Sequence, residues 1–192
     1  MVLCPKELKV ELSDGMLSGE LPAQCCPDCG GAWVRPEVYQ TWQDERGIDR
    51  EAEPTVTKIP SQTPIDFHPP SLDNRAALCP DCRHYLVRGR IQLPQEVIFF
   101  VERCPNCKGY WCDRGEWAVL EQLELTHRLD YIFNEQWQSQ VKALDWAIRE
   151  RDATIEKLGP DIAVKVFELA ELLEEHPNGD FGVAYLMRRF EE

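Results

Sequence analysis

The sequence predicts an α+β fold made of two β-hairpin units, each closed by two cysteine-containing turns, followed by a C-terminal α-helical domain. Three observations predict it. Cys-Pro turns occur at four places in the first 110 residues, residues 26–33 (CPDCGGAW) repeat as residues 104–111 (CPNCKGYW), and the last third of the chain has helical periodicity. A chain of 192 residues can hold one ordinary domain or two to three small ones.

The clearest pattern is a pair of Cys-Pro-x-Cys turns separated by 21 residues, which contain Cys79 and Cys82, then Cys104 and Cys107. Two such turns can direct four thiolates at one ion, and this spacing is typical of tetrahedral zinc. Four thiolates leave no position for water, so we predict one structural Zn²⁺. Because about forty residues bury little apolar surface, we expect the ion to contribute on the order of 10–16 kcal/mol to folding.

The first unit carries an incomplete copy of this pattern. Cys4, Cys26 and Cys29 stand at matching positions, and Glu7 replaces the fourth cysteine. Three alternatives remain open for this second candidate metal site: Glu7 supplies an oxygen ligand, the neighbouring Cys25 replaces it, or the unit holds no metal. Adjacent side chains of an extended backbone point to opposite sides, which argues against Cys25.

Hairpins are expected between the cysteine turns of both units. In the second unit, residues 88–94 alternate polar and apolar side chains and residues 97–104 are rich in β-branched and aromatic residues. In the first unit, Asp14-Gly15 predicts the hairpin turn. Gly31 and Gly109 follow the second cysteine turn of each unit, where we expect a left-handed backbone.

The remaining segments divide the chain further. Prolines without periodicity predict a linker over residues 43–76, with Ile59, Ile65 and Phe67 as sparse anchors to a folded surface. Asp113 and Glu116 form a capping-box pattern, which predicts a helix reaching about residue 157 with an interruption near residue 126. Gly159-Pro160 should stop this helix and start another one.

The expected boundaries are 1–42 for the incomplete unit, 43–76 for the linker, 77–118 for the complete unit and 119–192 for the acidic helical domain.

The complete unit resembles the transcription-factor-IIB-type zinc ribbons of small bacterial proteins, whose pattern is two CPxC turns, then G-x-W-x-D-x-GE leading into a helix. The matching residues are Cys79, Cys82, Cys104, Cys107, Gly109, Trp111, Asp113, Gly115 and Glu116. The first unit matches more weakly at Cys4, Cys26, Cys29, Gly31, Trp33 and Glu37, and departs at Glu7 and Arg35. The resemblance covers about 75 residues as two tandem copies, of which the first is degenerate, and it implies a ribbon fold and zinc binding but no activity.

Charge and composition limit the classes of function. The formal charge of −13 is shared between acidic flanks, −7 over residues 1–74 and −8 over 119–192, and a central segment of +2. Such a chain is a poor general binder of nucleic acid. No stretch has the length of a membrane span or the form of a signal peptide, so we expect a cytoplasmic protein with reduced thiols, which the odd count of nine cysteines also favours.

These observations favour a non-enzymatic, zinc-binding interaction protein, such as an adaptor, assembly factor or regulatory factor, with a protein partner. An alternative is a transcription-associated factor that contacts RNA polymerase or nucleic acid through the central ribbon. The third is an enzyme, either a thiol–disulfide oxidoreductase or a hydrolase with an open zinc at the incomplete site. Redox cysteines generally lie at a helix N-terminus rather than in such turns.

Overall fold

The computed structural model describes residues 2–190 and confirms a mixed α+β architecture. The chain divides into two compact units, Met1–Asp145 and Trp146–Glu192, and the boundary falls within a helix. The first unit therefore contains both cysteine repeats, the segment between them and residues 119–145. This division differs from the expected boundary after residue 118, because the chain following the second repeat packs under the sheet.

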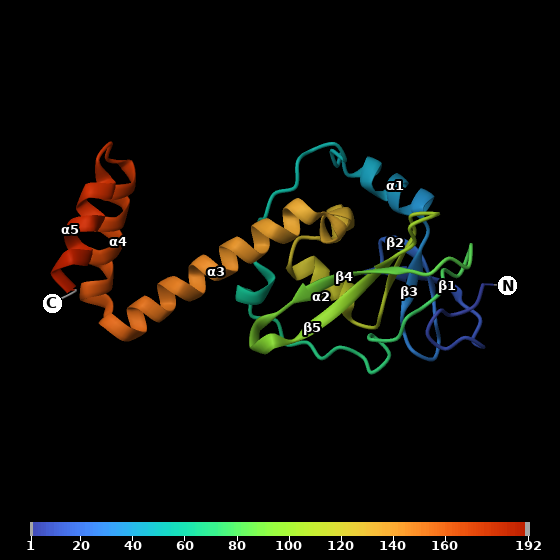
Figure 1. Ribbon diagram of the computed structural model, residues 1–192. Coiled ribbons are helices and arrows are strands. Elements are labelled where there is room, and N and C mark those ends of the chain that lie inside the picture. Colours follow the sequence, from blue (N-terminus) through green and yellow to red (C-terminus); the bar gives the residue numbers. More distant parts are fainter. Residues whose placement is uncertain (1, 191–192) are drawn as a thin grey trace. The chain divides into compact units, whose positions relative to one another are not determined.

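One six-stranded antiparallel sheet forms the centre of the first unit (Figure 1), in the order β1-β2-β3-β6-β5-β4. The strands are β1 (Ser13–Leu17), β2 (Leu21–Cys25), β3 (Ala32–Val34), β4 (Val87–Gln92), β5 (Ile98–Arg103) and β6 (Tyr110–Cys112). The first three belong to the first repeat and the last three to the second. The repeats are joined where β3 pairs with β6, so they share a single sheet instead of forming separate modules.

The two faces of this sheet have different partners. Trp33 and Trp111 are register partners on the face that carries the cysteine turns. Val34 and Tyr110, one residue along, lie on the opposite face among the residues of the larger apolar core. Helices α1 (Pro36–Glu45) and α2 (Glu116–Gln122) contribute to that core. The sheet thus separates an apolar layer from a cysteine-rich layer.

The hairpin of the first repeat turns at Ser18 and Gly19, not at Asp14-Gly15. Both turn residues have positive φ, 46° and 71°, and the N–H of Glu20 donates to the carbonyl of Leu17 at 3.0 Å. Gly15 lies within β1, where an added Cβ would stand 2.7 Å from the sulfur of Cys25. This glycine therefore permits close approach between two strands.

The proline-rich segment packs along the first unit, as its anchors suggested. It contains the 3₁₀-helix η1 (Pro60–Gln62), and a second 3₁₀-helix, η2 (Pro94–Glu96), joins β4 to β5. Phe67 packs edge-on against Phe99 of β5 with ring centroids 5.3 Å apart. Asp73, near the end of the segment, is fully buried. Residues 43–76 are therefore part of the first unit and not a free tether.

The predicted long helix is interrupted, as the sequence suggested. After α2, the chain forms the 3₁₀-helix η3 (Thr126–Phe133) before α3 (Glu135–Leu158) begins. Arg128 leaves helical geometry inside η3, and Leu129 and Ile132 are buried in the core. The side chain of Asn134 accepts the N–H of Trp137 at 3.0 Å, which is typical of a helix start. The interruption thus turns apolar side chains toward the sheet.

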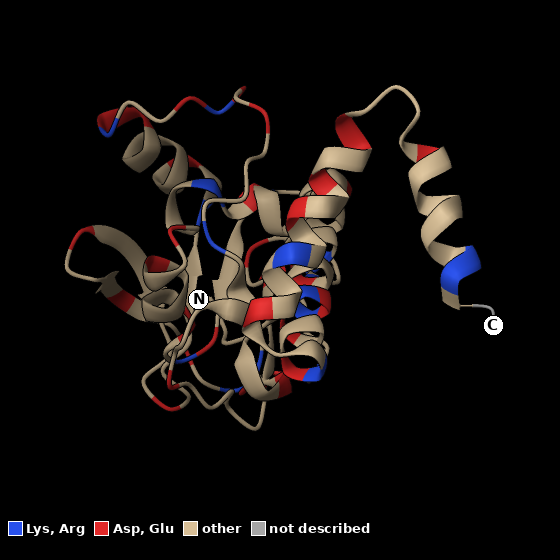
Figure 2. Cartoon of the chain, turned by 90° about the vertical axis from the view of Figure 1, so that its left-hand side faces the viewer, with Lys and Arg blue, Asp and Glu red and all other residues tan. Residues whose placement is uncertain are grey.

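The second unit contains the end of α3, α4 (Pro160–Glu175) and α5 (Gly179–Phe190). As predicted, α3 ends before Gly159 and α4 begins at Pro160. The turn into α5 is tight, because a Cβ added at Gly179 would stand 1.8 Å from the carbonyl oxygen of Leu173. Figure 2 shows the basic residues of α5 at its C-terminal end, where Arg188 and Arg189 complement the helix dipole.

Candidate metal centres and the seam between the repeats

Four turns, which we call knuckles, share one backbone geometry: residues 4–7, 26–29, 79–82 and 104–107. In each, the N–H of the fourth residue donates to the sulfur of the first. The N···S distances are 3.2 Å for Glu7 to Cys4, 3.5 Å for Cys29 to Cys26, 3.5 Å for Cys82 to Cys79 and 3.4 Å for Cys107 to Cys104. The incomplete knuckle therefore keeps the turn although it lacks the second cysteine.

The left-handed residue of each knuckle comes directly after the turn. Its φ is 46° at Leu8, 72° at Gly30, 61° at Arg83 and 71° at Lys108. The expected positions, Gly31 and Gly109, are one residue too late. A side chain in this conformation costs about 1–2 kcal/mol. Only one of the four positions is glycine, so the remaining interactions of the knuckles must offset that cost.

The complete knuckles bring Cys79, Cys82, Cys104 and Cys107 together. The sulfurs of Cys79 and Cys107 are 3.5 Å apart and those of Cys82 and Cys104 are 3.4 Å apart. Zn–S bonds of about 2.3 Å in a tetrahedron require sulfur–sulfur distances of about 3.8 Å, whereas a disulfide requires about 2.05 Å. All nine cysteines are free. The donor set and spacing fit a zinc ion.

The thiols of this site lie in unequal surroundings. Burial raises the pKa of the Cys79 and Cys107 thiols. The backbone N–H of His84 lowers the pKa of the Cys82 thiol to about 5. Four thiolates at this distance repel one another, and a bound divalent cation offsets that repulsion and the loss of solvation. Such a closed set of sulfur ligands supplies a structural site rather than a catalytic one.

The first repeat brings Cys4, Cys26 and Cys29 together, with the sulfurs of Cys4 and Cys29 3.7 Å apart. Within residues 2–190, no His, Asp, Glu or fourth Cys joins this group, so Glu7 lies outside it. Cys25 is directed at Gly15 on β1 and packs against the larger core. The structure thus offers three sulfur ligands here, and neither of the two considered fourth ligands is in place.

The seam between the repeats, β3 paired with β6, is built on two tryptophan–glycine contacts. A Cβ added at Gly31 would stand 2.2 Å from the ring of Trp111, and one added at Gly109 would stand 2.4 Å from the ring of Trp33. Both tryptophans are fully buried. Each repeat therefore supplies a glycine that makes room for the tryptophan of the other, which explains both glycines without a left-handed backbone.

Two ion pairs connect the repeats across the seam. At two positions where the second repeat has an acidic residue, the first repeat has a basic one. Lys6 stands where the second repeat has Asp81, and Arg35 stands where it has Asp113. Lys6 lies 3.3 Å from the carboxylate of Asp113, and Arg35 lies 3.2 Å from that of Asp81. Asp81 also accepts the indole N–H of Trp33 at 2.9 Å. Two basic residues of the first repeat are therefore paired with the two acidic residues that stand at the equivalent positions of the second.

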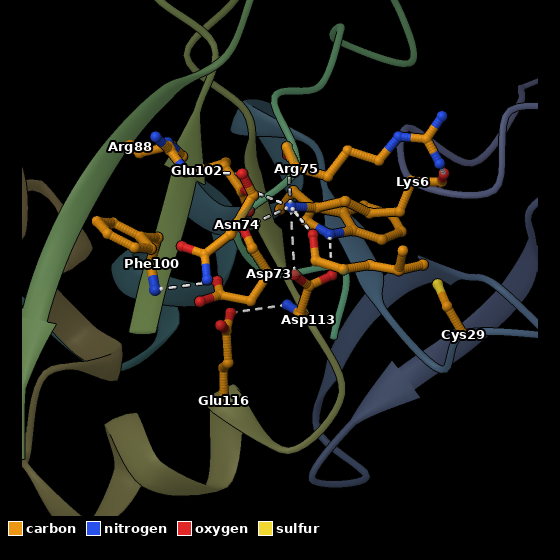
Figure 3. Close-up of polar contacts among 12 residues, drawn as sticks. Lys6, Cys29, Asp73, Asn74, Arg75, Arg88, Phe100, Glu102, Asp113 and Glu116 are labelled. Carbon is orange, nitrogen blue, oxygen red and sulfur yellow. Dashed lines mark hydrogen bonds and ion pairs between the residues drawn. The ribbon is translucent and has the colours of Figure 1, made fainter. Parts of the chain in front are cut away.

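Lys6 is at the centre of a buried polar cluster (Figure 3). Its ammonium forms an ion pair with Glu102 and donates to three backbone carbonyls, those of Leu72, Asp73 and Arg75, at 3.1–3.2 Å. Burial lowers the pKa of Lys6, but the two carboxylates outweigh this effect and the net pKa is raised. The cluster thus connects the first knuckle to the proline-rich segment and to β5.

The carboxylates of Asp73, Asp113 and Glu116 lie together in the same cluster, and each accepts an N–H group of the protein. Asp73 accepts the N–H of Phe100 at 3.1 Å, Asp113 accepts the indole N–H of Trp111 at 2.8 Å, and Glu116 accepts the N–H of Asp113 at 2.7 Å. The last bond is one half of the predicted capping box. The Asp113 side chain does not cap α2, because it is directed at Trp111 and Lys6.

Burial raises the pKa of three acids in this cluster, Asp73, Glu102 and Glu116. The pKa of Glu102 reaches about 8 although Lys6 lowers it, and those of Asp73 and Glu116 are raised as well. Sequence reasoning did not identify Lys6, Asp73 or Glu102 as buried. The only signal for Lys6 was its place inside a Cys-Pro turn, and Asp73 lay in a segment expected to be a linker.

No helix in residues 2–190 is both long enough and apolar enough to cross a membrane. Comparison with protein families, with curated proteins and with solved structures found no match for the chain.

Proposed function

We propose that the chain is a non-enzymatic, zinc-binding interaction protein of the cytoplasm, in which the first unit is a rigid scaffold and the second unit binds a partner protein. The observation that carries the proposal is an apolar groove of about 650 Å³ between α4 and α5. The lining residues are Val166, Leu169, Ala170, Leu173, Glu174, Asp180, Val183, Leu186, Met187 and Phe190. Adaptors, assembly factors and regulatory factors all fit this description.

Zinc at the Cys79, Cys82, Cys104 and Cys107 set has a structural role in this proposal. Four sulfur ligands fill a tetrahedron and leave no position for a substrate or for water. The ion would fix the two knuckles that flank β4 and β5, and so support the sheet on its cysteine-rich face. A closed site of this kind supports the proposal that the sheet of the first unit serves as a scaffold.

The helices of the second unit are more apolar than a solvated pair requires. Leu169, Val183, Met187 and Phe190, which all line the groove, are 41–86% exposed. A contiguous apolar surface of this kind marks an interaction site in a soluble protein. Met187 and the leucines of the groove are flexible side chains that adapt to a bound surface.

The occupant that this groove fits is an amphipathic helix of a partner protein, with basic residues beside its apolar stripe. Residues 146–192 carry six basic and eleven acidic side chains, a balance of −5. Glu174 and Asp180 lie at the groove itself. A helix that places apolar residues at intervals of three and four would fill the groove, and its flanking lysines or arginines would pair with these carboxylates.

The nucleic-acid alternative has less support, because several basic side chains of the central segment are engaged within the protein. Arg88 donates to the carbonyl of Asn74 at 3.1 Å and lies over the ring of Phe100. Arg103 lies between the rings of Tyr110 and Phe133, with centroid distances of 5.6 and 5.8 Å. These contacts leave fewer cations free to neutralise phosphates.

A photo-crosslinking amino acid placed at Leu169, inside the groove, tests the proposal. Leu172 on the same helix is exposed but does not line the groove, so the same probe there is the matched control. We expect position 169 to crosslink to a basic, amphipathic helical segment of another protein, and Leu169→Glu to abolish its binding while Leu172→Glu preserves it.

Two results would contradict this occupant. Crosslinks between copies of this chain, with a dimer that Leu169→Glu dissociates in sedimentation analysis, would assign the groove to self-association. Binding of RNA or DNA that weakens steeply with salt, with no crosslink from position 169, would favour the alternative function.

A further inference from the structure

We infer that the first repeat holds a second zinc ion on Cys4, Cys26 and Cys29, with its fourth coordination position open to an exogenous thiolate or imidazole. The inference concerns a different site from the groove and does not depend on the proposed function. Three sulfurs within zinc-binding distance of one another supply the donor set. Thiolates are the ligands that zinc and other soft ions prefer.

The knuckle that lacks a cysteine still has the form of a metal-binding turn. The N–H of Glu7 donates to the sulfur of Cys4 at 3.2 Å, as the fourth residue does in the three complete knuckles. The N–H of Leu8 donates to the carbonyl of Cys4 at 3.0 Å, and the same bond recurs in the other three. N–H donors aimed at a sulfur stabilise its thiolate form. The first sulfur of the turn is therefore prepared for an ion although the second is missing.

The missing ligand belongs to the corner of the site that faces solvent. In every complete knuckle the first cysteine is buried and the second is partly exposed: Cys26 and Cys29, Cys79 and Cys82, Cys104 and Cys107. Cys4 is buried and Glu7 is partly exposed, so they follow the same pattern. An external ligand could therefore approach at the position where the second repeat has Cys82, without opening the core.

The chain leaves the incomplete knuckle by a different path, although the turn itself keeps its form. The N–H of Cys4 donates to the carbonyl of Val10, six residues later in the chain. In the other three knuckles, the N–H of the first cysteine donates to the carbonyl five residues later. The extra residue changes the path of the chain after Glu7. Lys6, which precedes Glu7, forms buried ion pairs with Glu102 and Asp113, and these contacts hold the turn in place.

Three sulfur ligands with a vacant fourth position also differ in charge from a closed site. One Zn²⁺ with three thiolates carries −1, and with four it carries −2. A neutral imidazole or an anionic thiolate from outside would complete the tetrahedron. Such a ligand could come from a small molecule or from a cysteine or histidine side chain of a partner, and the two sources share one coordination chemistry.

The test measures metal content and then the cobalt spectrum of the full chain. Native mass spectrometry should find two zinc ions in the wild type and one in Cys29→Ser. After replacement by Co²⁺, whose d–d bands report ligand type, imidazole or 2-mercaptoethanol should shift the absorption of the wild type. Glu7→Ala should behave like the wild type, because Glu7 is not a ligand. Glu7→Cys should bind two ions and show no shift, because it closes the site.

Three results would overturn the inference. One is a wild type that holds a single ion while its Cys79 site is loaded. Another is the loss of the second ion in Glu7→Ala, which would make Glu7 the fourth ligand. The third is a second cobalt ion whose spectrum does not respond to added ligand. Glu7 is partly exposed, so circular dichroism should show both of its variants folded. To separate the sources, a histidine-containing peptide and free imidazole are compared at equal concentration.

Discussion

Replacing Lys6 by methionine tests whether its ammonium neutralises the buried acids at the seam. The side chain is fully buried and contacts two carboxylates and three backbone carbonyls. Methionine has a similar length but cannot donate. Removing one partner of a buried ion pair typically costs about 3–5 kcal/mol, because the remaining charge is left without compensation.

The carbonyls that Lys6 contacts would also lose their donor, at about 1 kcal/mol each when no water replaces it. These terms overlap, so we expect a loss of about 4 kcal/mol or more, against a typical total stability of about 5–15 kcal/mol. The control is Lys9→Met, because Lys9 is a nearby lysine that is exposed to solvent. This variant should change stability by less than about 0.5 kcal/mol.

Urea unfolding at fixed free zinc, followed by tryptophan fluorescence in a Trp146→Phe background, measures this loss in the first unit. Trp146 is the tryptophan of the second unit, so its removal leaves probes only around the sheet. Adding Glu102→Gln to Lys6→Met should recover part of the loss, because one unpaired acid is removed. A loss below about 1 kcal/mol for Lys6→Met would refute the reasoning, since the carboxylates would then be neutralised by protons and not by the lysine.

Three further predictions concern the seam, the pH dependence and the metal. Gly31→Ala should cost about 2 kcal/mol or more of stability in the same assay, because a Cβ there meets the ring of Trp111 at 2.2 Å. The control Gly47→Ala has open space around its Cβ and should cost about 1 kcal/mol, because its positive φ disfavours a side chain. Equal losses would disprove the contact. Burial raises the pKa of Glu116, so the folded state holds a proton that the unfolded state has released, and the protein loses stability as the pH rises above the ordinary carboxyl range toward the raised pKa. With zinc in excess, Glu116→Gln should therefore lose less stability than the wild type between about pH 6 and about pH 8. An equal loss in the two proteins would contradict this. Zinc chelation should accelerate hydrogen exchange at the knuckle amides of Cys82 and Cys107, whereas the amide of Val101 in β5 should stay protected by the apolar core. If the Val101 amide lost its protection together with the knuckle amides, the ion would hold the whole sheet.

Local pattern was sufficient to predict the parts of the fold that depend on neighbouring residues. The cysteine turns, the β4–β5 hairpin, the interruption of the long helix and the restart at Pro160 all follow from spacing or from backbone chemistry. The first hairpin turn was placed wrongly, because Asp14-Gly15 and Ser18-Gly19 are both acceptable turn dipeptides. Packing decided between them, since Gly15 is needed beside Cys25.

Contacts between distant segments were not predictable in this way. Nothing local indicates that β3 pairs with β6, so the sequence did not predict whether the two repeats contact each other. For the same reason, the burial of Lys6 and Asp73 was missed: Lys6 contacts residues 67 and 96 positions away, and the side chain of Asp73 accepts the N–H of Phe100, 27 positions away. The expected dependence on zinc assumed a separate module of about forty residues, whereas the second repeat shares the apolar core of a larger unit, in which Phe99 and Val101 are fully buried.

The exchanged charges at the seam make the pairing of the repeats selective. Two second repeats brought together in this geometry would oppose the acids Asp81 and Asp113, and two first repeats would oppose the bases Lys6 and Arg35. Only unlike halves attract, and like charges in contact are costly where water is excluded. In a chain built from related halves, the exchanged charges therefore disfavour the pairing of two like halves from neighbouring copies.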